Sequence, residues 1–230
     1  MPITILKDSV TPDLERLKRD LAAIHRKKIT VGIHKDQASD EVLNYAAIHE
    51  FGGTITAKNV KNLAIPLTKE AKQKSPRDFT DAFVIVSKKK KLLLVRDKRM
   101  RTKKGAISKK AHKIIGPPQE HELELLYALK HSVNIPERSY VRASFDTGQD
   151  VINGAVNEAL DGVMHGERDA STALNHIGKT GMEMTQQYIT QGRVQPATGA
   201  LARSLKTQET TLFDQGRLVG SITYKVDREG

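Results

Sequence analysis

Two histidine–glutamate pairs are the residues of this chain that come nearest to a hydrolytic metal motif. His49-Glu50 and His121-Glu122 each begin like the helix that supplies two zinc ligands and a general base in one class of metallopeptidase. Neither pair has a second histidine three residues after its glutamate. A zinc site would therefore need three ligands brought together from distant positions. The other histidines are scattered, so we expect no metal and no cofactor: His25, His34, His112, His131, His165 and His176.

Other catalytic patterns are missing as well. The sequence has no glycine-rich phosphate loop and no Gly-x-Ser-x-Gly turn for an activated serine. It has no cysteine, which excludes a thiol nucleophile, a thiolate metal site and disulfides. Its neighbouring acids, such as Asp13 and Glu15, are the kind of residue usually found exposed. A hydrolase assembled from distant histidines and carboxylates remains an alternative, but the residues favour a protein that is not an enzyme.

The positive charge is concentrated in one segment. The net charge is +11, yet residues 88–113 hold thirteen lysines and arginines against Asp97 alone, so the rest of the chain sums to −1. Such a block is either a solvated loop or a surface for an anionic partner. The candidate contact residues within it are Lys88, Lys89, Lys90, Lys91, Arg99, Arg101, Lys103, Lys104, Lys109 and Lys110.

The partner of this basic segment could be packaged DNA or an acidic neighbouring subunit. The segment contains no aromatic side chain on which bases could stack, so sequence-specific readout is not indicated. A nucleic-acid-binding protein without sequence preference, using residues 88–113, is the alternative function. It predicts an affinity that falls steeply with salt.

Periodicity places the elements that would carry these residues. Helices are expected after Thr11, with Leu14, Leu17, Leu21 and Ile24 as one apolar stripe, and from Ser39 to Gly52. Further helices are expected over residues 149–164 and from Asp169 to Gly192. Strands are expected over residues 29–33 and 222–226, and a hairpin with a charged tip over 83–86 and 92–95. Residues 63–67 open a different region.

The clearest strand pattern covers residues 123–135. Leu123, Leu125, Tyr127 and Leu129 are expected on one face, and Pro136 should end the ladder because it lacks an N–H donor. The run forms either one bent strand or a pair of strands, because strands usually extend over about 5–6 residues. Together the patterns predict an α+β fold, with a small antiparallel or mixed sheet packed by helices and an inserted β-hairpin and basic loop. No apolar run reaches the length of about 18 residues needed for a membrane span, and residues 1–4 lack a signal-peptide layout. We therefore expect a soluble, unexported protein without a membrane partner.

Three motifs follow one another along the chain. Motif 1 (residues 45–53) contains His49-Glu50-Phe51-Gly52, and motif 2 (residues 135–142) contains Ile135-Pro136-Glu137-Arg138-Ser139-Tyr140. Motif 3 (residues 212–224) contains Leu212-Phe213-Asp214-Gln215-Gly216-Arg217-Leu218-Val219-Gly220-Ser221-Ile222. In order and context they resemble the sequence motifs of the Mu G-like virion-morphogenesis and tail-completion proteins, found at the head–tail neck of bacteriophages. Glu137, Ser139 and Gln215 depart from the commonest family pattern.

The resemblance implies a structural virion protein that joins head and tail or completes the tail. It implies a homo-oligomeric ring, with other neck, tail or connector proteins as partners. Its location would be the virion, and the host cytoplasm during assembly. Residues 1–60 and 124–230 correspond to the shared core, and residues 61–123 to an insertion.

Single residues of the motifs suggest local roles. Arg138 and Arg142 lie where helices begin, where each could brace a carbonyl or carboxylate across an interface or within the chain. Gly216 should permit a tight turn, and Asp214 and Ser221 are expected to be structural.

Overall fold

The computed structural model describes residues 10–97, 123–199, 204–205, 210–212 and 216–228. The chain forms two compact units. Unit 1 comprises residues 1–52, 136–198 and 208–230, and unit 2 comprises residues 53–135 and 199–207. Helices and small antiparallel sheets occur together, which confirms the predicted α+β class. Of the helices in the described ranges, none is long and apolar enough to cross a bilayer.

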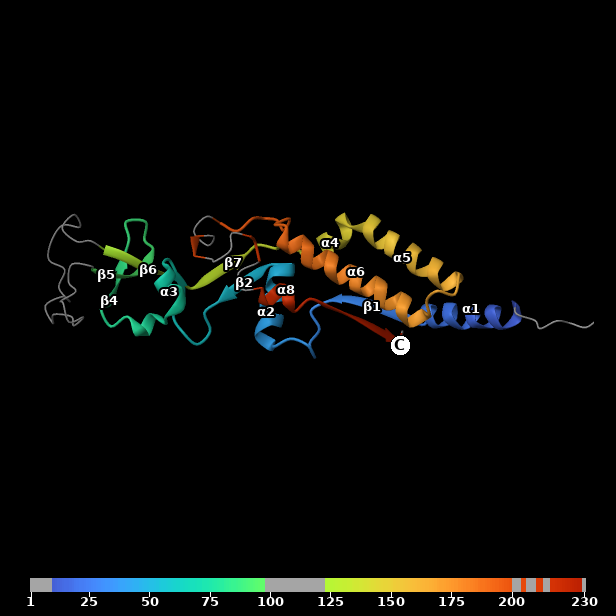
Figure 1. The fold of residues 1–230 in the computed structure, drawn as a ribbon. Coiled ribbons are helices and arrows are strands. Elements are labelled where there is room, and N and C mark those ends of the chain that lie inside the picture. The colour runs from blue at the N-terminus through green and yellow to red at the C-terminus, as the bar shows by residue number, and fades with distance from the viewer. Residues whose placement is uncertain (1–9, 98–122, 200–203, 206–209, 213–215, 229–230) are drawn as a thin grey trace, which may run out of the picture. The chain divides into compact units, whose positions relative to one another are not determined.

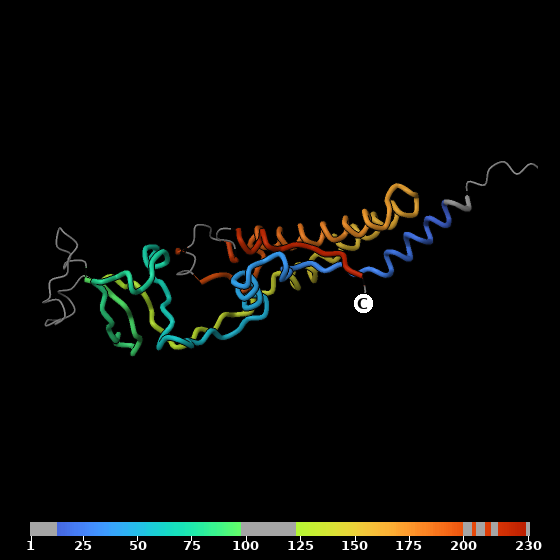
Figure 2. Tube along the Cα trace, turned by 90° about the horizontal axis from the view of Figure 1, so that it is seen from below, coloured from blue at the N-terminus to red at the C-terminus, as the bar shows by residue number. Residues whose placement is uncertain are grey.

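Unit 1 is mainly helical, with one pair of strands. β1 and β8 pair antiparallel from Lys27 opposite Arg228 to Gly32 opposite Thr223. Both strands run along α6, and α5 lies beside α6 (Figures 1 and 2). The elements of unit 1, labelled as in Figure 1, are α1 (Val10–His25), β1 (Lys27–Gly32), α2 (Asp40–Phe51), α4 (Val141–Thr147), α5 (Gln149–Met164), α6 (Ala170–Thr190), α8 (Arg217–Gly220) and β8 (Thr223–Arg228).

The predicted helix boundaries are confirmed at most ends in unit 1. The Ser39 side chain accepts a hydrogen bond from the Val42 N–H at 3.4 Å, and Asp169 accepts one from the Thr172 N–H at 2.7 Å. These bonds satisfy donors that the first turn of a helix leaves free. α2 ends before Gly52, whose φ of 70° is left-handed. α1 begins at Val10, earlier than the cap expected at Thr11.

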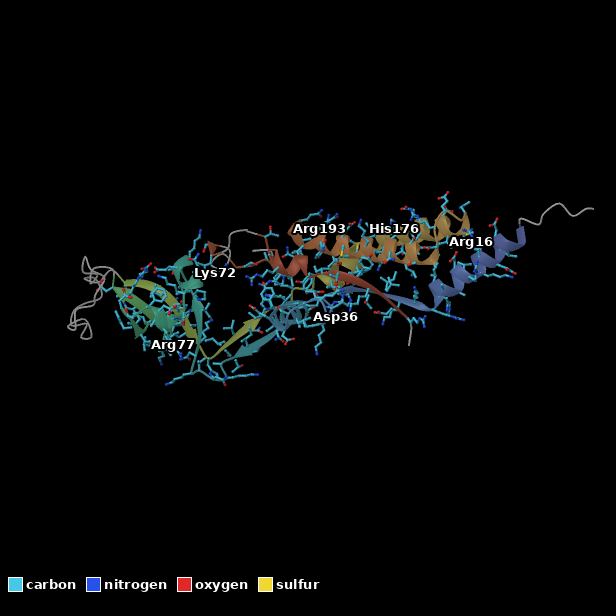
Figure 3. The ribbon with its side chains drawn as sticks, turned by 60° about the horizontal axis from the view of Figure 1, so that its bottom comes forward. Arg16, Asp36, Lys72, Arg77, His176 and Arg193 are labelled. Carbon is cyan, nitrogen blue, oxygen red and sulfur yellow. The ribbon has the colours of Figure 1, made fainter. Side chains whose placement is uncertain are left out.

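The predicted apolar stripe of α1 is only half buried. Leu17 and Ile24 pack on a core cluster of Ala159, Val163 and Ala173, whereas Leu14 and Leu21 are exposed. At 3.6 residues per turn, the exposed pair lies some tens of degrees around the helix from the buried pair. Figure 3 labels Arg16 on the same helix, and its guanidinium packs against Gly166 in the α5–α6 turn.

Unit 2 is built from short strands. β3, β6, β5 and β4 form one sheet in that order, and β2 pairs with β7 in a separate ribbon; all neighbours are antiparallel. The predicted hairpin is thus confirmed. The elements are β2 (Gly53–Thr56), β3 (Leu63–Pro66), α3 (Lys69–Gln73), η1 (Pro76–Asp78), β4 (Ala82–Val86), β5 (Leu92–Asp97), β6 (Leu123–Lys130) and β7 (Ser132–Ile135).

The predicted alternation over residues 123–135 is wrong in its first half. A bulge shifts the register: Leu94 lies opposite Tyr127, but Val95 lies opposite Leu125. The extra residue, Leu126, is fully buried, and Leu125 is 43% exposed. A bulge inserts one residue and so reverses which side chains face the core beyond it. The run forms a pair of strands, as the sequence allowed: β6 ends at Lys130, and β7 joins a different sheet.

Unit 2 is wider than the predicted insertion of residues 61–123. It starts at Gly53 and, after the segment outside the described residues, continues to Ile135. The reason is strand pairing: β6 pairs with β5 and β3, and β7 pairs with β2. Strands that share hydrogen-bonded partners belong to the same compact unit.

Candidate functional site

Glu50 of motif 1 is a side chain of unit 1 that accepts four hydrogen bonds. Although it is a carboxylate, it is only 8% exposed. It accepts hydrogen bonds from the Ser139 hydroxyl at 2.7 Å and from the backbone N–H groups of Tyr140, Val141 and Arg142 at 2.8, 3.1 and 3.2 Å. These donors form the start of α4. Glu50 therefore caps a helix about ninety positions further along the chain, in motif 2.

The Glu50 carboxyl group stays ionised in this setting. Burial alone would raise its pKa, but the hydrogen bonds from Ser139 and from three backbone N–H groups outweigh burial and lower it. Burial raises the pKa of the neighbouring Tyr140 hydroxyl, and the Glu50 charge adds to that rise. With four donors on its two oxygens, Glu50 is suited to fixing a helix and not to accepting a proton from a substrate.

The backbones of motifs 1 and 2 also meet directly. The Arg138 N–H donates to the His49 carbonyl oxygen at 2.7 Å. A Cβ atom placed on Gly52 would lie 2.8 Å from the Glu137 nitrogen, which is closer than real Cβ contacts come. Only glycine fits this crossing, and its left-handed φ makes any other residue costly as well.

Motif 3 completes the same core. One cluster of buried side chains takes Ala46 from motif 1, Tyr140 from motif 2 and Leu212, Leu218 and Ile222 from motif 3. Ile189 and Val194, from α6 and the segment after it, complete the cluster. The three motifs, which span most of the length of the chain, thus pack into one place. We call this cluster, with Glu50 and the start of α4, the motif junction.

Polar side chains of α6 fasten the motif junction from its other side. The buried hydroxyls of Ser144 and Thr185 lie 2.9 Å apart and join α4 to α6. The Gln186 amide donates to the carbonyl oxygens of Val219 and Ile222 at 3.3 and 3.2 Å. These hydrogen bonds join α4 and the segment around α8 to α6 and so help to fix the geometry of the junction.

The Gly216 prediction is confirmed within motif 3. Gly216 has a left-handed φ of 75° and precedes α8, and the Ser221 hydroxyl donates to the Arg217 carbonyl at 2.7 Å at the other end of that helix. These roles are structural. The predicted cap at Asp214 lies outside the described residues.

The predicted basic contact residues divide into two groups. Lys88, Lys89, Lys90 and Lys91 form the turn of the β4–β5 hairpin, and all four are exposed. Six others lie outside the described residues: Arg99, Arg101, Lys103, Lys104, Lys109 and Lys110. Whether the segment meets DNA or protein stays a prediction.

Arg138 and Arg142 make contacts within the chain. The Arg138 side chain donates to the Pro196 carbonyl oxygen at 2.9 Å. The Arg142 guanidinium is exposed and pairs with Glu137 of the same motif. The intrachain brace is therefore the observed arrangement, and an additional contact across an interface stays a prediction.

An ionic network in unit 2 joins an arginine to two glutamates. The Arg96 side chain is 7% exposed and binds Glu70 of α3 and Glu124 of β6, each at 2.5 Å. Hydrogen bonds from Arg96 and then Lys74 lower the pKa of Glu70 to about 2. The guanidinium also lies 5.7 Å from the centre of the Phe79 ring. The network fixes α3 on the sheet.

The role of Glu50 was not predicted from the sequence. In the sequence, His49-Glu50 is an incomplete zinc motif and a part of motif 1, and helices are expected to begin near Arg138 and Arg142, but neither pattern predicts that Glu50 caps one of these helices. A signal did exist, because α4 has Tyr140 at its N-cap position and no side-chain cap of its own. Such a helix start needs an acceptor from elsewhere. Within the described residues, no group of three or more histidines and carboxylates is placed to hold a metal ion.

Comparison with known proteins gives no match: no protein-family model, curated protein or solved structure resembles the chain significantly.

Proposed function

We propose that this chain is a structural virion protein of a tailed phage, acting in head–tail joining or tail completion at the neck as part of a ring oligomer. The observation that carries the proposal is the motif junction. The three motifs that resemble the phage family meet in one core and hold one another in place. Residues that resemble a family's pattern and also cooperate physically are better support than separate short matches.

The character of the junction supports a structural role. Its one buried carboxylate is occupied by four donors, and its other members are mainly apolar. Such a core gives a rigid body whose exposed surface can make repeated contacts. In a ring, each subunit uses one patch on the next subunit, and the rotation closes the circle.

The first experiment measures the size of the purified full-length chain by light scattering over a range of concentrations. A ring predicts a discrete oligomer several times the 25.5 kDa chain mass. Leu14 and Leu21, exposed on one stripe of α1, offer the test variant Leu14→Glu with Leu21→Glu. The control is Val151→Glu, which places a glutamate at an exposed valine of α5.

The second experiment adds the protein to separated heads and tails from a phage that lacks its own copy of the gene. The proposal predicts that the wild-type chain increases the yield of joined, infectious particles. A chain that remains monomeric and does not restore joining contradicts the proposal. Mature particles that do not contain the polypeptide contradict it as well.

A further inference from the structure

The free edge of the unit 2 sheet differs from its other edge. The sheet order β3-β6-β5-β4 leaves β3 and β4 with one sheet neighbour each among the described strands. β3 contains Pro66, which has no N–H to offer a further strand. β4, residues 82–86, contains neither a proline nor a charged residue. Natural edge strands usually carry one of these features to prevent pairing.

The side chains of β4 also present apolar surface. Val84 is 54% exposed and Val86 is 66% exposed. They lie two residues apart and therefore point to the same face of the sheet. Each lies opposite a leucine of β5, Leu94 and Leu92 respectively, so a strand added beside β4 would find a continuous apolar row.

Four lysines, in the turn of the β4–β5 hairpin, follow these valines in the chain. The turn that carries Lys88–Lys91 has a defined backbone: the Ser87 N–H donates to the Lys91 carbonyl and the Lys90 N–H to the Ser87 carbonyl, both at 2.8 Å. Lys90 adopts a left-handed φ of 57°. The Lys91 N–H also donates to the Ser87 hydroxyl at 3.2 Å. The charges therefore sit at a fixed end of the strand.

We propose that β4 is a docking edge for an extended acidic protein segment that carries small apolar side chains. The segment adds as a strand to β4, covers Val84 and Val86 with its apolar side chains, and places its carboxylates near Lys88–Lys91. Main-chain hydrogen bonds supply affinity in this mode of recognition, and side chains supply selectivity. The inference concerns unit 2 alone and does not depend on the proposed role in phage assembly.

The combination of features favours a protein segment over a nucleic acid. Phosphate groups would satisfy the lysines but would leave the two valines in water. The turn carries no aromatic side chain for base stacking. An acidic strand uses the backbone edge, the valines and the lysines together.

The test measures binding of two fluorescent peptides to the full-length chain by anisotropy. One peptide is short and alternates glutamate with valine. The other has the same side chains but is N-methylated along its hydrogen-bonding edge, so it keeps the charge and cannot pair as a strand. We expect the first to bind at least about tenfold more tightly than the second, with amide NMR shifts concentrated at residues 82–86.

Two sets of variants assign the contact. Val84→Thr with Val86→Thr keeps β-branched residues in the strand and removes apolar surface. Lys88→Gln, Lys89→Gln and Lys91→Gln remove charge at the turn. Each set should weaken peptide binding several-fold. The matched control changes three exposed lysines elsewhere in unit 2, Lys58→Gln, Lys61→Gln and Lys130→Gln, and should leave binding unchanged.

The other outcomes overturn the proposal. Equal binding of both peptides shows a charge contact without strand addition. A double-stranded DNA oligonucleotide that binds while the peptide does not assigns the lysines to nucleic acid. If neither the unmodified peptide nor the DNA binds, the role left for the lysines is to protect an exposed strand edge from self-association. Circular dichroism of each variant separates these results from a loss of folding.

Discussion

Unit 1 and unit 2 each use carboxylates to fasten a helix to a distant stretch of chain, but they balance the negative charge differently. In unit 1, Glu50 is held by a hydroxyl and three backbone N–H groups, all uncharged. In unit 2, Glu70 and Glu124 share the guanidinium of Arg96. Backbone N–H groups have fixed positions, so they hold the Glu50 carboxylate in one geometry. Ion pairs between long, partly exposed side chains are weaker, and salt screens them.

The largest expected effect is the loss of the Glu50 cap. Glu50→Ala leaves three N–H groups and the Ser139 hydroxyl without their acceptor in a buried place. We expect unit 1 to lose about 3–5 kcal/mol of unfolding free energy. Hydrogen exchange read by mass spectrometry can follow each unit separately. Glu50→Gln keeps one oxygen and should cost less, and Asn44→Ala, exposed on the same helix, is the control.

The corresponding change in unit 2 is Arg96→Met. It removes the shared cation and leaves Glu70 and Glu124 facing each other's charge. Because these carboxylates are 34% and 23% exposed, water offsets part of the loss, and we expect about 1–3 kcal/mol. Arg77→Met, at the exposed arginine labelled in Figure 3, is the control. An effect as large as that of Glu50→Ala would contradict the distinction between the two units.

An effect of similar size is expected where the backbones of motifs 1 and 2 cross. Gly52→Ala places a Cβ atom 2.8 Å from a backbone nitrogen at a left-handed φ, so it should cost about 1–3 kcal/mol. Gly154→Ala provides the contrast. It lies within α5 with open space around it, and alanine there should stabilise the helix by up to about 1 kcal/mol. Thermal unfolding of both variants measures the difference.

Lowering the pH should destabilise both units, by less than the substitutions above. The folded pKa of Glu70 is about 2, below its ordinary value of 4.5. Its contribution to the stability of unit 2 is therefore complete above pH 4.5 and is lost as the pH falls toward 2. The lowered pKa of Glu50 gives unit 1 a loss of the same sign. Added salt should shrink the acid-dependent loss in unit 2 more than in unit 1, as hydrogen exchange at several pH values would show.

Much of the fold followed from local patterns in the sequence. Ser39 and Asp169 each cap a helix through a side-chain oxygen three residues away, a relation visible within one short window. The hairpin at residues 82–97 was equally local, since two apolar runs flank a polar turn. Chemistry that acts over a few residues is readable without knowing the rest of the structure.

The remaining features depend on partners far along the chain. The Leu126 bulge exists because β6 must satisfy β5 and β3 together, and no window of β6 alone contains that condition. The cap by Glu50 joins positions ninety residues apart. The motif junction could be predicted only in part. The sequence shows the three motifs in order, but their contact through Ala46, Tyr140 and Leu218 depends on tertiary packing.

The pairing of β2 with β7 has a consequence for how the segment between these two strands can evolve. Gly53 stands opposite Ile135, so the two ends of the segment 53–135 lie side by side. Everything between these two residues can lengthen, shorten or be exchanged during evolution while its ends keep the same spacing.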